Sequence, residues 1–185
     1  MFGFRVAAGS LVLLAALTAC GGQASSPAPT PQTPSSTSTA TPPPSGTSAA
    51  AVPQQLEFTA KTVDGKDFRG AELAGKPAVL WFWAPWCPKC QREAPGMAAA
   101  AKEHGAKVTF LGVAALDQVP AMQQFVQKYG LQSFQHLADV DSAVWKRFGV
   151  TAQPAYAFID AAGQVEVVTT QLSEQDLKQR LSKLA

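Results

Sequence analysis

Cysteine, histidine and charge are scarce in this chain of 185 residues, of which only 15% are charged. The cysteines and histidines are Cys20, Cys87, Cys90, His104 and His136. A structural zinc site needs four ligands, and no second cysteine pair accompanies Cys87 and Cys90. Gln91 follows Cys90, where covalent haem attachment needs a histidine. These shortages argue against both kinds of site.

Basic runs are also missing, and the formal net charge is only +2. Nucleic-acid binding requires a concentrated positive surface, so we expect no nucleic-acid partner. Apolar residues make up 46% of the chain, which is enough for one domain with a real core and an unfolded remainder.

The amino-terminal segment has the pattern of an export signal. Arg5 precedes an apolar run from Val6 to Leu17. That run is too short to span a membrane as a helix and has the length of a signal-peptide core. We therefore expect residues 1–19 to be a signal peptide and the mature protein to lie outside the cytoplasm.

The four residues Leu17–Cys20 resemble a bacterial lipobox, in which the cysteine receives a lipid and becomes the first mature residue. The alternative is an ordinary secreted protein with a stray thiol. We favour a lipoprotein anchored to the outer face of the cell membrane through Cys20, because a free exposed thiol would be a liability outside the cell.

Residues 20–52 read as a linker. From Gly21 to Val52 the chain is rich in Pro, Ser, Thr, Ala and Gly, with no charge and no aromatic residue. Such a segment cannot bury a core and is expected to be unfolded, spanning at most about 90 to 100 Å. The folded domain is then predicted over residues 53–185.

The chemistry centres on the segment around Cys87 and Cys90. An apolar run rich in Val, Trp and Phe predicts a buried strand over Ala78–Trp83, and Pro88 suits the first turn of a helix. Cys87 then lies at a helix N-terminus, where the dipole favours a thiolate, and Lys89 adds positive charge. Cys90 falls on the same helix face, within the span of a disulfide. This arrangement predicts a redox site.

Periodicity predicts alternating strands and helices in the rest of the domain. We expect strands at 56–59, 67–69, 78–83, 107–114, 134–138, 155–159 and 164–169, and helices at 87–103, 120–128, 141–148 and 173–184. A strand, helix and strand over 78–114 require a parallel pair.

The segment Phe82–Cys90 resembles the active site of the thioredoxin superfamily. Glu93 and Pro95, three and five residues after Cys90, are similar to the TlpA/ResA/DsbE-like branch, and in particular to actinobacterial DsbE-like and DsbF-like proteins, some of them lipoproteins. The resemblance covers Leu56–Ala185. It implies an α/β, thioredoxin-like fold with a central mixed sheet flanked by helices, an N-terminal hairpin and a central insertion.

The resemblance also implies roles for individual residues. Gln153 and Pro154 match the cis-proline loop, which offers backbone hydrogen bonds to an extended substrate. Thioredoxins keep a buried acid six residues before the first cysteine, but Trp81 stands there. Glu93 is then expected to serve as proton acceptor or electrostatic modulator near Cys90. The alternative is a solvated Glu93 paired with Lys89.

Trp86 and Lys89 are expected to modulate the cysteine pair. No cofactor is expected beyond the redox-active disulfide of Cys87 and Cys90, and no metal.

The implied activity is thiol-disulfide exchange. We favour oxidation of thiols in exported proteins, with a membrane redox partner that recycles the disulfide. Reduction of disulfides in cytochrome c maturation is the runner-up, because the same residues serve both directions.

The residues argue against two other classes of protein. Sco-like copper proteins have a similar fold, but they separate their cysteines by three residues and not two, and His136 is expected to be a surface or satisfied residue. A peroxidase of the peroxiredoxin type needs a threonine ahead of its cysteine, where this chain has Pro85.

Overall fold

A computed structural model describes residues 52–184 of the chain. The predicted signal peptide, the Cys20 lipid site and almost all of the linker lie outside the described residues. None of the helices within residues 52–184 has the length and apolar character of a membrane-spanning segment.

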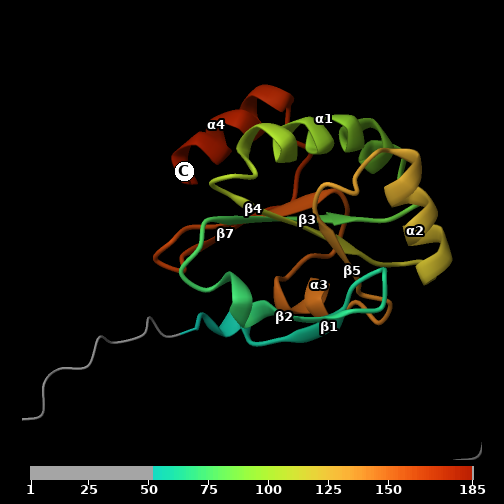
Figure 1. The fold of residues 1–185 in the computed structure, drawn as a ribbon, viewed down its shortest axis with the longest axis horizontal. Helices are drawn as coiled ribbons and strands as arrows, with labels where there is room; N and C mark the ends of the chain where they lie inside the picture. Colours follow the sequence, from blue (N-terminus) through green and yellow to red (C-terminus); the bar gives the residue numbers. More distant parts are fainter. Residues whose placement is uncertain (1–51, 185) are drawn as a thin grey trace, which may run out of the picture. The chain divides into compact units, whose positions relative to one another are not determined.

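Strands and helices alternate from Ala78 to Ile159 (Figure 1). The strands are β1 (Thr59–Lys61), β2 (Asp67–Arg69), β3 (Ala78–Trp83), β4 (Thr109–Ala114), β5 (Gln135–Ala138), β6 (Ala155–Ile159) and β7 (Val165–Val168). The α-helices are α1 (Pro88–His104), α2 (Val119–Lys128), α3 (Ala143–Arg147) and α4 (Glu174–Leu184). Two short 3-10 helices are η1 (Gln54–Leu56) and η2 (Gly70–Leu73).

Five strands form a mixed sheet in the order β5-β4-β3-β6-β7. The pairs β3·β4 and β4·β5 are parallel, whereas β3·β6 and β6·β7 are antiparallel. Strands β1 and β2 form a separate antiparallel hairpin. The sheet and its helices have the α/β, thioredoxin-like architecture expected from the sequence.

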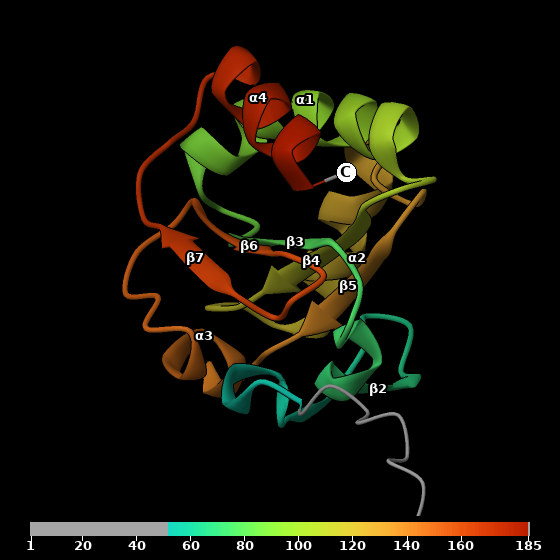
Figure 2. The same ribbon diagram turned by 90° about the vertical axis from the view of Figure 1, so that its left-hand side faces the viewer.

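The central strand β3 is buried along its whole length and divides the core into two layers. Trp81 and Trp83 point toward α1, α2 and α4, while Leu80 and Phe82 point toward α3 and the hairpin. Side chains alternate between the two faces of a strand, so one apolar run supplies both layers. Figure 2 shows α1 and α4 on one side of the sheet and α3 with β2 on the other.

Several predicted boundaries need correction. Leu56 lies in η1 and not in a strand, because the hairpin starts only at Thr59. Strand β4 starts at Thr109, two residues later than expected. The helix predicted over 141–148 is only the five-residue α3, because Asp139 accepts hydrogen bonds from the N–H groups of Val144 and Trp145 and fixes where it starts.

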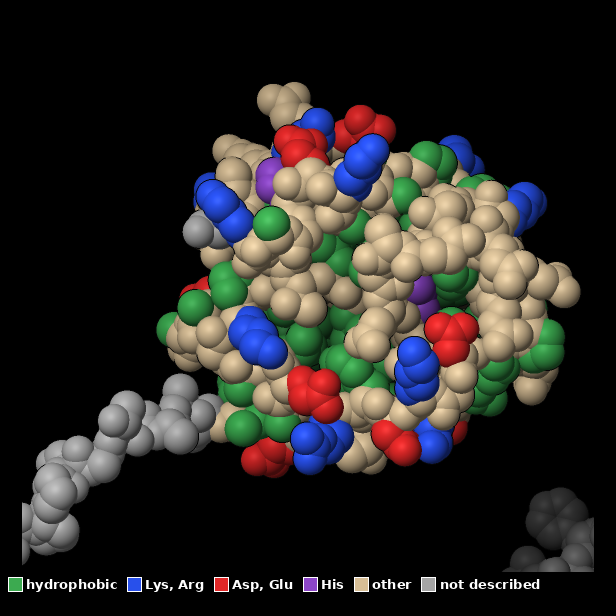
Figure 3. Space-filling model, viewed as in Figure 1, with side chains coloured by type: hydrophobic (Ala, Val, Ile, Leu, Met, Phe, Trp, Pro, Cys, Tyr) green, Lys and Arg blue, Asp and Glu red, His purple; other side chains and the backbone are tan. Residues whose placement is uncertain are grey.

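The last helix begins as the sequence predicted. The Ser173 hydroxyl accepts a hydrogen bond from the backbone N–H of Asp176 at 3.1 Å and donates one to its carboxylate at 2.6 Å. Positive and negative side chains are interspersed on the face seen in Figure 3, without a large patch of one sign.

Candidate active site

The polypeptide places Cys87 at the start of α1. Strand β3 ends at Trp83, and a turn follows in which the N–H of Cys87 donates to the carbonyl of Ala84 at 3.1 Å. Cys87 is the N-cap residue of α1, and Pro88 begins the helix, where a missing N–H costs nothing. The Sγ of Cys87 accepts a hydrogen bond from the backbone N–H of Cys90 at 3.1 Å. The sulfur thus occupies the positive end of the helix.

The two cysteines have unequal environments although both are thiols here. Cys90 is completely buried and Cys87 retains 3% exposure. Burial raises the pKa of the Cys90 thiol far above its usual range, and its hydrogen bond with Cys87 and the nearby Glu93 carboxyl raise that pKa further. Cys90 therefore holds its proton, and Cys87 is the sulfur nearer to solvent.

Glu93 sits one helical turn beyond Cys90 and points inward. Its Oε2 accepts a hydrogen bond from the hydroxyl of Tyr156 at 2.6 Å and one from the indole N–H of Trp81 at 3.3 Å. Burial raises the pKa of the Glu93 carboxyl, and these two hydrogen bonds, together with the nearby side-chain amide of Gln171, partly oppose the rise. The alternative of a solvated Glu93 paired with Lys89 is wrong, because the carboxyl is turned toward β3 and β6.

Sequence reasoning missed Tyr156. The register of the antiparallel pair β3·β6 sets Tyr156 opposite Trp81, so both reach the same carboxyl from the same face of the sheet. The alternation of the strand Ala155–Ile159 could have assigned Tyr156 to one face. Only the register across the two strands tells which face and which partner.

Trp86 and Lys89 lie at the surface around Cys87. The Trp86 side chain is 53% exposed, and its indole N–H donates to the carbonyl of Leu116 at 3.0 Å. Leu116 has a positive φ of 62° in the loop after β4. Lys89 is exposed in the first turn of α1. The hydrogen bond from Trp86 to Leu116 ties the turn that carries Cys87 to the loop after β4.

The Gln153–Pro154 peptide bond is cis, as predicted. Pro154 is buried and immediately precedes β6, whose first residue, Ala155, pairs with Phe82 near the end of β3. Because β6 runs antiparallel to β3, the start of β6 meets the end of β3. The loop therefore opens at the sheet end from which the chain continues to Cys87.

His136 does not lie at the surface, contrary to one part of the expectation. Its side chain is buried in β5, with 2% exposure, and Nε2 lies 3.1 Å from the carbonyl oxygen of Leu131. Burial lowers the pKa of His136 to about 4. Within residues 52–184, no three His, Cys, Asp or Glu side chains are grouped so that they could hold a metal ion.

A cysteine pair at the N-terminus of a helix that follows the central strand of such a sheet defines a thioredoxin-like thiol-disulfide oxidoreductase. Comparison with known proteins agrees. Residues 52–168 match the AhpC/TSA family, and the chain belongs to this family.

Two individual relatives show which members of the family the chain resembles. The soluble secreted antigen MPT53 of Mycobacterium tuberculosis is 46% identical over 139 residues, which cover 74% of this chain and 79% of that protein. The thiol-disulfide oxidoreductase ResA of Halalkalibacterium halodurans is 33% identical over 131 residues, covering 69% of this chain and 73% of the relative.

Among solved structures, MTB dsbF in its mixed oxidized and reduced forms is similar, with a TM-score of 0.71 and 59% identity over 72% of this chain and 99% of that one. The resemblance seen in the sequence to DsbF-like and ResA-like proteins is thereby confirmed.

Proposed function

We propose that this protein oxidises thiols of exported proteins to disulfides, with Cys87 and Cys90 as the redox-active pair. The observation that carries the proposal is the asymmetry of the pair. The sulfur of Cys87 caps α1 and accepts the N–H of Cys90, whereas Cys90 is fully buried. An attacking thiolate therefore meets Cys87 first.

The exchange proceeds in two steps. A substrate thiolate attacks Sγ of Cys87 in the oxidised pair, the bond between Cys87 and Cys90 breaks, and the electron pair passes to Sγ of Cys90. A second substrate thiolate then attacks the substrate sulfur of the mixed disulfide and expels Cys87. The helix N-terminus stabilises the negative charge that develops on Cys87 as it leaves. The substrate loses two electrons and the cysteine pair gains them.

Glu93 supports this chemistry as proton donor and acceptor for Cys90. The leaving Cys90 sulfur is generated in a buried site where a thiolate is strongly disfavoured. A nearby carboxyl whose pKa is raised by burial can hold a proton for it. In the opposite direction the same carboxyl accepts the proton of Cys90.

Substrate contacts are proposed for the surface around Cys87. The half-exposed indole of Trp86 offers apolar area, and Lys89 offers positive charge. The backbone around Gln153 and Pro154 opens beside the end of β3 and is assigned to an extended substrate segment.

Regeneration of the disulfide needs an oxidant, and we propose a membrane redox partner for that role. Export and lipid attachment at Cys20 belong to the same proposal, since a protein tethered outside the membrane meets both its substrates and this partner. Metabolic lipid labelling should disappear in a Cys20→Ser variant. Undiminished labelling of that variant would contradict anchoring while leaving the redox proposal intact.

Disulfide reduction in cytochrome c maturation is the second candidate, supported by the 33% identity to a protein named ResA. The reduction potential of the pair separates the two directions. A value near about −120 to −180 mV matches oxidants and isomerases, whereas about −270 mV or below matches thioredoxin-like reductants.

The site itself is tested by trapping. A Cys90→Ser variant should accumulate mixed disulfides with reduced, cysteine-containing exported proteins after mild oxidation, because Cys90 can no longer attack Cys87 and release the substrate. A Cys87→Ser variant is the matched control and should trap none. Equal trapping by both variants would contradict the assignment of Cys87 as the attacked sulfur.

A further inference from the structure

The two oxygens of the Glu93 carboxyl have different surroundings. Oε2 accepts hydrogen bonds from both Tyr156, at 2.6 Å, and Trp81, at 3.3 Å. Oε1 is buried and accepts no well-formed hydrogen bond within the described part of the chain, although the side-chain amide of Gln171 lies near the carboxyl and lowers its pKa. A buried carboxylate oxygen without a partner is costly, which favours a proton on this carboxyl.

The hydrogen-bond pattern fixes which oxygen takes that proton. Each carboxylate oxygen offers about two lone-pair directions, and Tyr156 and Trp81 occupy those of Oε2. A proton added to Glu93 therefore binds Oε1, from which it can be donated onward.

Tyr156 is suited to act only as a donor in this contact. Burial raises the pKa of its phenol above the usual range, and the neighbouring Glu93 and Cys90 raise it further. Its position is set by the backbone, because it pairs with Trp81 across β3 and β6. The two donors to Oε2 are thus held by a single strand pair.

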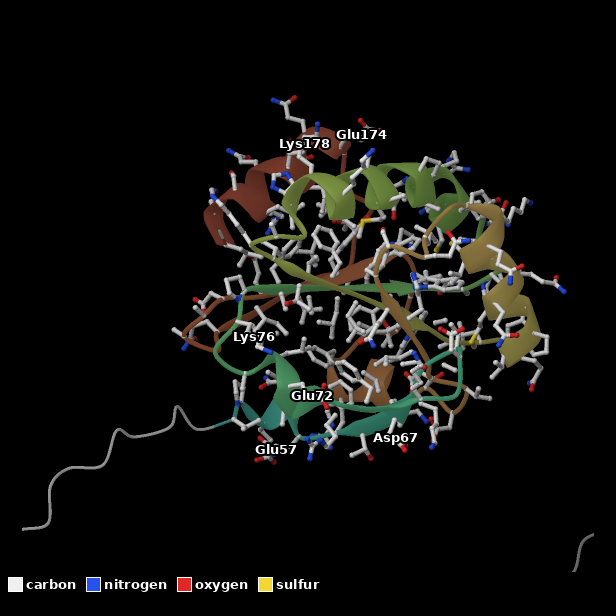
Figure 4. All side chains as sticks on the ribbon, in the orientation of Figure 1. Glu57, Asp67, Glu72, Lys76, Glu174 and Lys178 are labelled. Carbon is white, nitrogen blue, oxygen red and sulfur yellow. The ribbon has the colours of Figure 1, made fainter. Side chains whose placement is uncertain are left out.

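A cavity of about 170 Å³ adjoins this carboxyl. Glu93 and Met97 of α1 line it together with Tyr156, and the segment from Gln171 to Leu177 closes the other side. One water occupies about 30 Å³ in the liquid, so the cavity has room for several, and its polar walls offer them partners. Figure 4 shows Glu174, at the start of α4, on the outer side of this region beside α1.

We propose that Tyr156 and Trp81 are positioning residues that confine the exchangeable proton of Glu93 to Oε1, and that this proton is replaced from solvent through the adjoining cavity. The inference rests on the proposed role of Glu93. When a substrate thiolate bonds to Cys87 and the disulfide breaks, Cys90 takes the electron pair and the proton from Oε1. Water in the cavity then returns a proton to Glu93.

Ionisable groups face this carboxyl from three elements. Cys90 and Arg92 lie on α1, Tyr156 on β6, and Glu174 at the cavity wall on α4. The positive charge of Arg92 lowers the pKa of Glu93, as do the hydrogen bonds from Tyr156 and Trp81.

The test compares variants by the titration of Glu93. Tyr156→Phe keeps the ring and removes the hydroxyl that stabilises the carboxylate. The Glu93 titration, followed by carboxyl ¹³C NMR and by the pH profile of disulfide cleavage with a small dithiol, should move upward by on the order of one pH unit. Trp81→Phe should move it in the same direction by less, since that hydrogen bond is longer. Tyr129→Phe, on α2's C-terminal side, is the matched control and should leave it unchanged.

The Glu93→Gln variant separates the positioning role of Tyr156 and Trp81 from the proton role of Glu93. It should abolish the titration altogether. If it does, but Tyr156→Phe and Trp81→Phe leave the midpoint in place, the positioning role is wrong and the role of Glu93 stands. If the titration persists in Glu93→Gln, both the positioning role and the proton role of Glu93 are overturned. Trapping at Cys87 tests the exchange reaction independently of either result.

Discussion

The indole nitrogen of Trp81 lies 3.3 Å from Oε2 of Glu93. Trp81 stands on β3 where thioredoxins hold a buried acid, and here the acid reaches the same region from α1. Trp81 donates a hydrogen bond to that acid. The buried carboxyl beside the second cysteine is thus supplied by a different element of the fold, and the strand and the helix must be aligned correctly for it to form.

Glu93→Gln should change how the stability of the reduced protein depends on pH. The pKa of Glu93 is raised in the folded state above its ordinary value of 4.5, so Glu93 ionises at lower pH in the unfolded chain. The stability that the protonated carboxyl contributes is complete below about pH 4.5 and is lost at higher pH. The variant should therefore gain stability relative to the parent between pH 4 and pH 8.

Urea unfolding at several pH values measures this difference. Glu57→Gln, an exposed change on the opposite side of the sheet (Figure 4), is the control and should follow the parent at every pH. A stability difference for Glu93→Gln that is the same at pH 4 and pH 8 would contradict the prediction.

His136 should make the protein sensitive to acid in the opposite sense. Burial lowers its pKa from 6.5 to about 4. Between these two pH values the imidazole is protonated in the unfolded state and neutral in the folded state. Stability is retained above pH 6.5 and lost as the pH falls through about 4, by roughly 3 kcal/mol in total.

A His136→Gln variant should remove this part of the acid dependence in denaturant titrations between pH 7 and pH 4. His104→Gln, in the last turn of α1, serves as the control for loss of an imidazole elsewhere. An acid dependence in His136→Gln as steep as in the parent would show that His136 is not its source.

Gly112→Ala should destabilise the domain. A Cβ at this position of β4 would overlap the ring of His136, which pairs with it across β4 and β5. Overpacking of this kind costs about 1–3 kcal/mol. His136→Ala in the same chain should recover part of the loss, giving a favourable coupling in a double-mutant cycle.

Gly96→Ala is the matched control, because the nearest atom to its new Cβ would be 3.6 Å away and the position lies within α1. Thermal unfolding should show it as stable as the parent or more so, since alanine favours a helix. Equal losses at Gly96 and Gly112 would argue against the overlap with His136.

Trp86→Ala should slow reaction with a reduced protein substrate several-fold and change reaction with a small dithiol much less. The side chain is 53% exposed beside Cys87 and offers apolar area that only a polypeptide can cover. Trp86→Phe keeps most of this area but loses the hydrogen bond to Leu116.

Stopped-flow rates with both substrates separate these contributions. If Trp86→Phe is as slow as Trp86→Ala with the protein substrate, the hydrogen bond to Leu116 matters and the apolar area does not. Equal slowing with the small dithiol would place the effect on the cysteine pair itself.

Much of this protein follows from its sequence. The apolar run from Ala78 to Trp83 had to be a buried strand, and Pro88 after Cys87 had to begin a helix, because these preferences are local. The cysteine pair and the order of strands and helices follow from the same signals. Helix and strand ends were less certain, as at α3, where a side chain from outside the helix fixes the first turn.

The environment of Glu93 was decided by the tertiary structure alone. Sequence spacing allowed an exposed pair with Lys89 equally well, because residues four apart share a helix face whichever way that face is turned. The register of β3 against β6 brings Trp81 and Tyr156 to one carboxyl oxygen. Glu93 is 12 positions from Trp81 and 63 from Tyr156. Such contacts depend on strand pairing and helix packing, which no local pattern encodes.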